Sequence, residues 1–159
     1  MKKLIICLLM IIVAVVFGTD TSKSEEKKST NIEAIAYDSI LAEKLGADQY
    51  GMRSYVIAFL KPGPNRDQDS TTAVNLQKAH RANINRLADE GKLVLAGPFL
   101  DGGDIAGIFI FNVATVEEAK ILTESDPAIQ AGRLIMELRP WYGSAALMQV
   151  NEVHKKLKK

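Results

Sequence analysis

The sequence is poor in the residues that most often bind metals or form covalent cross-links. It has one cysteine and two histidines among 159 residues. Cys7 lies inside an apolar run, while His80 and His154 are far apart in the chain. A zinc site usually takes four ligands from cysteine, histidine or carboxylate, often in a pattern such as HExxH, which is absent here. We therefore expect no metal site and no disulfide within the chain.

The motifs of nucleotide-binding sites and of serine hydrolases are also missing. The sequence has no GxGxxG, GKS or Gly-x-Ser-x-Gly pattern, and the glycines of Asp101-Gly102-Gly103-Asp104 are typical of a hairpin turn. We expect no cofactor. The 20 basic and 19 acidic side chains nearly cancel and form no basic stripe, which argues against binding to nucleic acid.

The N-terminus has the pattern of a secretory signal. A basic start, Met1-Lys2-Lys3, precedes an apolar run from Leu4 to Phe17, which is shorter than the about 20 residues that span a bilayer. We expect a signal peptide over residues 1–18, cleavage at Thr19, and export to the periplasm or the medium. The alternative is an uncleaved signal that anchors the chain in a membrane. Mass spectrometry of secreted or periplasmic material tests export, and an intact Met1 or the absence of the protein would contradict it.

The remaining chain divides into four predicted parts. Residues 19–31 are polar, lack aromatic side chains and indicate a flexible leader. Residues 32–53 contain an accessory helix, predicted from Ile32 to Leu45 with Asn31 as its cap and Gly46 as its end. Residues 54–143 form the main domain, and residues 144–159 form a C-terminal helix capped by Ser144.

The main domain has the element order strand, helix, strand, strand, helix, strand. This order, with helices on one face of the sheet, predicts an α+β, ferredoxin-like βαββαβ fold. The second face would be bare and partly apolar, which favours a homodimer. The expected strands are residues 55–60, 93–96, 105–113 and 133–139, the long helix begins at Ser70 or Thr71 and runs to Glu90, and the second helix spans residues 116–123.

Two residues are candidates for chemistry. His80 lies on the apolar stripe of the long helix, where a titratable ring is either a hydrogen-bonded core residue or a proton carrier. Asp126 directly precedes Pro127, and this pair predicts a single helical turn that ends at Gly132 with Asp126 as its N-cap. Capping would be a sufficient structural role for Asp126 in itself. The stripe consists of Ala73, Leu76, His80, Ile84 and Leu87.

Several separated segments resemble the YciI-like (YCII-related) family. They are AH at residues 79–80, LADEGKLVLAGPF, ESDPAIQAG and RPW, and the resemblance extends over residues 54–141. It implies a dimeric α/β barrel, in which two ferredoxin-like sheets pack face to face, and a His-Asp dyad at His80 and Asp126. An arginine that the family often has three residues before the histidine is Gln77 here. The flanking segments resemble an exported branch of the family.

The resemblance favours a small-molecule enzyme in which His80 is the general acid or base and Asp126 orients it. The expected reaction types are elimination, isomerisation and hydrolysis. The alternatives are a non-catalytic module of the cell envelope that binds a small ligand or a partner, and a purely structural role for both residues. Under the binding alternative, His80→Ala and Asp126→Ala leave the function intact if the chain still folds. A co-purified ligand identified by mass spectrometry would be the most informative single observation.

Overall fold

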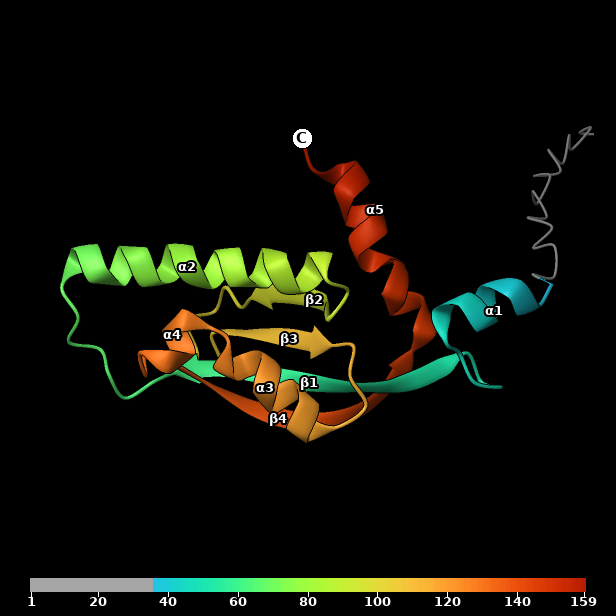
Figure 1. Cartoon of the computed structure of the whole chain (residues 1–159), viewed down its shortest axis with the longest axis horizontal. Helices are drawn as coiled ribbons and strands as arrows, with labels where there is room; N and C mark the ends of the chain where they lie inside the picture. The colour runs from blue at the N-terminus through green and yellow to red at the C-terminus, as the bar shows by residue number, and fades with distance from the viewer. Residues whose placement is uncertain (1–35) are drawn as a thin grey trace, which may run out of the picture. The chain divides into compact units, whose positions relative to one another are not determined.

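A computed structural model of the chain describes residues 36–159 (Figure 1). The predicted signal peptide at 1–18, the leader at 19–31 and the cap at Asn31 lie outside the described residues. Within residues 36–159, no helix is long and apolar enough to cross a membrane.

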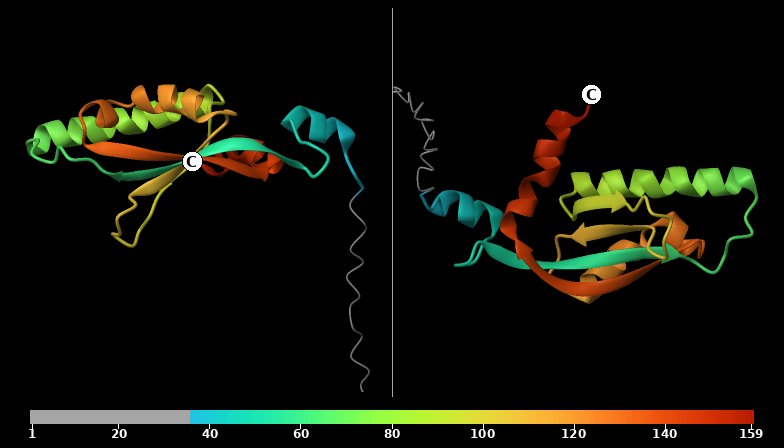
Figure 2. Two further views of the ribbon diagram at one scale, coloured as in Figure 1. Left: turned by 90° about the horizontal axis from the view of Figure 1, so that it is seen from below. Right: turned by 180° about the vertical axis from the view of Figure 1, so that it is seen from behind.

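The main domain is a four-stranded sheet with the strand order β2-β3-β1-β4, in which all neighbouring strands are antiparallel. The strands are β1 (Met52–Pro62), β2 (Leu93–Pro98), β3 (Gly107–Phe111) and β4 (Leu134–Ser144), and the helices between them are α2 (Ser70–Asp89), α3 (Val116–Glu124) and α4 (Pro127–Gln130). All three helices lie on one side of the sheet (Figure 2). The predicted α+β, ferredoxin-like fold is confirmed.

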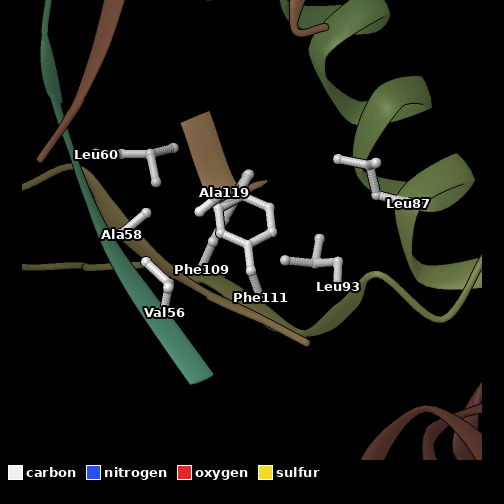
Figure 3. Close-up of a cluster of buried hydrophobic side chains, with 8 residues drawn as sticks. All are labelled: Val56, Ala58, Leu60, Leu87, Leu93, Phe109, Phe111 and Ala119. Atoms are coloured by element: carbon white, nitrogen blue, oxygen red, sulfur yellow. The ribbon is translucent and has the colours of Figure 1, made fainter. Parts of the chain in front are cut away.

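The main core lies between these helices and the sheet. Side chains alternate across a strand, so every second residue of β1 points towards α2 and α3. There they meet leucine from α2 and phenylalanine from β3 (Figure 3). Burial of this apolar area is the main stabilising contribution that fixes α2 on the sheet. The buried cluster is Val56, Ala58, Leu60, Leu87, Leu93, Phe109, Phe111 and Ala119.

The opposite face of the sheet is covered only at one end. There the 3-10 helix η1 (Ala145–Gln149) packs Leu147 and Met148 against a small cluster around Tyr55 and Ile110. Further along the same face, Phe59 and Ile108 are neighbours in the sheet and both are half-buried. A partly apolar sheet face therefore remains uncovered in the single chain.

Charged side chains also lie on this uncovered face, since Glu137 is the neighbour of Phe59 in the sheet. Lys61 and Arg139 both donate hydrogen bonds to the Glu137 carboxylate, and Lys61 lies 2.5 Å from it. The Lys61 hydrogen bond, followed by that of Arg139, lowers the pKa of Glu137 from 4.5 to about 2. The carboxylate therefore stays ionised at a lower pH than an isolated glutamate would, and its charge offsets the repulsion between the two cations.

The strand β4 extends further at its C-terminal end than the sequence predicted. Pro140 was expected to close the strand at Arg139, but β4 continues to Ser144 and pairs with β1 along its whole length. The reason is that β4 is an edge strand, where the missing N–H of a proline can face outward without breaking a ladder bond. Proline at this position is compatible with the strand.

The flanking helices also differ from their predicted bounds. Residues 36–38 are not helical, so the predicted helix from Ile32 to Leu45 is not continuous, and its start at Ile32 lies outside the described residues. The observed helix α1 (Ser39–Leu45) is capped by the carboxylate of Asp38. Its end is confirmed, since Gly46 adopts the left-handed conformation. Ser144 caps the 3-10 turn η1, and α5 (Val150–Leu157) begins only after it.

Candidate functional site

His80 lies in the middle of α2 and faces the sheet. The helix is capped by Asp69, whose carboxylate accepts a hydrogen bond of 3.0 Å from the Thr72 amide, and it continues to Asp89. The His80 ring is parallel to that of Phe109 on β3, with centroids 6.0 Å apart. The exposed fraction of His80 is 5%. The predicted inward orientation of His80 is confirmed.

Asp126 is fully buried, and each of its two carboxylate oxygens has its own partner. Oδ1 accepts a hydrogen bond of 2.9 Å from the Ala128 amide, so the predicted N-cap of α4 is confirmed. Oδ2 lies 2.6 Å from Nδ1 of His80. The sequence interpretation treated the cap and the histidine partner as alternative roles, and the structure shows that one side chain makes both contacts.

This contact determines which ring nitrogen can react. When the Asp126 carboxylate is ionised it can only accept hydrogen bonds, so in that state Nδ1 of His80 carries the proton between the two groups. The neutral ring then has its lone pair on Nε2, which has no hydrogen-bond partner within residues 36–159. A proton taken up at Nε2 would create an imidazolium beside the Asp126 carboxylate, which stabilises it.

A pocket of about 600 Å³ lies beside His80, between α2 and the sheet. Its size is within the usual range for sites that hold small organic molecules. The sheet contributes apolar walls, and Phe109 is both the ring on which His80 stacks and part of that wall. These walls are Leu60, Ala96, Pro98, Phe109 and Leu134.

The loop that carries Asp126 is tied to α2 next to His80. Arg86 donates hydrogen bonds of 2.7 Å to Asn83 and 3.0 Å to the hydroxyl of Ser125, the residue before Asp126. Asn83 is itself buried and also accepts from Ser125. These bonds hold the start of α4 against α2, so the distance between His80 and Asp126 is fixed from both sides.

Tight backbone packing supports the other end of α4. Gly63 donates a hydrogen bond of 2.9 Å to Arg133, and a Cβ added at Gly63 would lie 2.1 Å from the carbonyl oxygen of Gly132. We expect Gly63→Ala to lower the free energy of unfolding by about 1–3 kcal/mol, because neither backbone segment can move away freely. Urea denaturation measures this change.

Gly97→Ala is the matched control, because a Cβ at Gly97 has open space around it and the residue has no positive φ. Equal stability of the two variants would contradict the packing argument.

The remaining sequence candidates lie elsewhere. His154 is exposed on α5, apart from the pocket. Trp141 and Tyr142 line a separate hollow of about 220 Å³ with Ser54 and Tyr55. Within the part of the chain that the structure describes, no three histidine, cysteine or acidic side chains gather closely enough to hold a metal.

Sequence reasoning missed part of the pocket. Arg81 and Asn85 line it together with Gln77, and all three come from α2. A signal was present in their spacing of four residues, which places side chains on one helix face next to that of His80. The signal does not identify a pocket by itself, because all three side chains are exposed and a polar side chain at the rim of a pocket has the same helical spacing as a solvated one.

Comparison with known proteins finds similarity over the main domain. The model of the YCII-related domain matches residues 55–142. A search of curated proteins gives no match. Among solved structures, the 5-chloro-2-hydroxyhydroquinone dehydrochlorinase from Burkholderia phenoliruptrix AC1100, in complex with 2,5-dihydroxybenzoquinone, is similar with 23% identity and a TM-score of 0.42, over 56% of this chain and 93% of that chain. Since the domain model spans more than half of the sequence, the chain belongs to the YCII-related domain family.

Proposed function

We propose that the protein is an enzyme that moves a proton on a small organic molecule, with His80 as general acid or base. The observation that carries this proposal is the hydrogen bond of 2.6 Å between Nδ1 of His80 and the buried Asp126, beside a pocket of about 600 Å³. A fixed ring with one nitrogen still unpartnered is the arrangement that proton transfer requires.

The proposed step is balanced within the site. Nε2 takes a proton from a C–H or O–H group of the ligand, and the electron pair of that bond remains on the ligand. The imidazolium then returns the proton to another ligand atom, to a leaving group or to water. Elimination and isomerisation begin in this way. In hydrolysis, Nε2 would instead take the proton of a water molecule that attacks the ligand, and the imidazolium would return that proton to the leaving group. The pocket favours none of the three.

Deuterium exchange tests the proposal without knowledge of the natural substrate. The protein is incubated in D₂O with a panel of small carbonyl compounds and organic acids, and NMR detects deuterium at carbon. We expect incorporation into at least one compound, and a rate lowered by about 10²-fold or more in His80→Gln, as for removal of a general base.

His154→Gln is the matched control, because this exposed histidine lies away from the pocket. Exchange that is equally fast in wild type and His80→Gln would refute a catalytic role. Saturable binding without any exchange would favour the alternative function, a module that binds a small ligand.

We further propose that the protein is an exported homodimer. The dimer is supported by the half-buried Phe59 and Ile108 on the part of the sheet face that η1 leaves uncovered, since an apolar face of this kind usually contacts a partner. A second copy would place two such faces together, as in a dimeric α/β barrel. Export is supported by the sequence of residues 1–18 alone.

A further inference from the structure

One side of the pocket is polar and the other is apolar. Gln77, Arg81 and Asn85 on α2 follow one another at intervals of four residues and line the same side. The sheet side offers only carbon side chains and backbone. A ligand that satisfies both sides must have an apolar body and a polar group at one end.

Arg81 is the charged member of this polar side. Within residues 36–159 it has no hydrogen bond and no carboxylate within ion-pair distance, whereas Arg86 on the same helix pairs with Glu90 at 2.8 Å. No acidic residue is among those that line the pocket, and Asp126 is fully buried behind His80. The described pocket therefore has a positive charge that no protein group neutralises.

The chemistry of the Arg81 guanidinium indicates which polar group the ligand has at its polar end. Arginine matches planar carboxylates with two parallel N–H donors. Arg81 is exposed at the rim of the pocket, so its guanidinium can be reached by a ligand. Gln77 and Asn85 lie one turn to either side and offer amide donors. The three side chains together are suited to an anion with two or more oxygen acceptors.

We propose that Arg81 binds the anionic end of the substrate and that the substrate class is small organic carboxylates with a flat apolar body. The body lies against Phe109 and Leu134, where a C–H or O–H group can face Nε2 of His80. This inference rests on the proposed function for the reacting end, while the anion contact is independent of any reaction.

Binding of three matched probes tests the inference. Benzoate, benzamide and benzylamine have the same ring and differ in charge, and NMR titration of the full chain gives their affinities. We expect benzoate to bind about tenfold more tightly than benzamide, as for one charge-assisted hydrogen bond, and benzylamine not to bind. Equal affinity for benzoate and benzamide, or no saturable binding of benzoate, would overturn the proposal.

Substitutions locate the contact. Arg81→Gln should lower the affinity for benzoate about tenfold and leave the affinity for benzamide unchanged. Arg81→Lys should lose less affinity for benzoate, since the lysine keeps the positive charge but lacks the planar guanidinium. Lys78→Gln removes a cation of the same helix that does not line the pocket and should change neither affinity. Benzoate binding that is the same in Arg81→Gln as in wild type would place the anion elsewhere.

The two proposals can fail separately. If benzoate binding depends on Arg81 but no compound exchanges deuterium, the anion site stands and the enzyme proposal fails. If His80-dependent exchange occurs while neutral and anionic probes bind alike, the enzyme proposal stands and the anion site fails.

Discussion

Asp126→Asn is expected to leave the protein folded while it moves the proton of the neutral His80 ring from Nδ1 to Nε2. The amide must keep its oxygen towards the Ala128 N–H, because the alternative orientation would place two donors face to face. Its NH₂ group then donates to Nδ1 of His80, in place of the carboxylate oxygen that lies 2.6 Å away in the native site. Long-range ¹H–¹⁵N NMR of the ring distinguishes the two tautomers.

This change of tautomer should abolish most of the proposed proton transfer. Nε2 would carry a hydrogen in the neutral ring and could no longer accept one, and the imidazolium would lose its neighbouring carboxylate. We expect the exchange rate to fall by about 10²–10⁴-fold, the usual contribution of a general base. An unchanged tautomer, or full activity in Asp126→Asn, would contradict the orienting role.

Asp126→Ala separates the chemical role from the structural one. It removes the helix cap, worth about 1 kcal/mol, and leaves the buried Nδ1 of His80 without a partner, which costs about 1–3 kcal/mol more. This variant should therefore be clearly less stable than Asp126→Asn in urea denaturation. Similar stability of the two would show that the buried contacts contribute little to folding.

Phe59→Lys is expected to dissociate the proposed dimer. Phe59 lies beside Ile108 and Glu137 on the uncovered sheet face, and a symmetric dimer would contain the substitution twice. Each lost burial of phenylalanine costs about 1.5–3 kcal/mol, so two copies weaken association by about 10²–10⁴-fold. Light scattering should change from twice the chain mass to the chain mass.

Val74→Lys is the matched control, since Val74 is an apolar side chain on α2 that is 66% exposed. It should leave the mass unchanged. A wild-type protein with the mass of one chain would refute the dimer.

The sequence predicted those parts of the site that depend on local pattern. The apolar period of α2 placed His80 inward, and Asp126-Pro127 predicted a cap whose geometry depends only on adjacent residues. The contact between them spans 46 residues, and no local pattern encodes it, so it followed only from the family resemblance. Arg81 was missed because its role depends on the sheet opposite α2, and periodicity cannot show whether a polar residue faces water or a pocket.

The bounds of strands and flanking helices failed for a related reason. Pro140 ends a strand in most local contexts, but it is tolerated when the strand is at the edge, and strand order is a property of the whole sheet. The sequence also did not indicate that α1 starts at Ser39. Asn31 and Asp38 are both suitable caps, and the sequence alone does not show which of them is used.

The double contact of Asp126 limits how this protein can change under mutation. Stabilising substitutions elsewhere usually widen the range of tolerated replacements, since the fold then survives the loss of a single contact. At Asp126 that extra stability could compensate for a lost cap, but it could not restore the ring orientation of His80. Under the proposed function, tolerance at this position is set by proton transfer, and engineering for heat resistance would leave that tolerance unchanged.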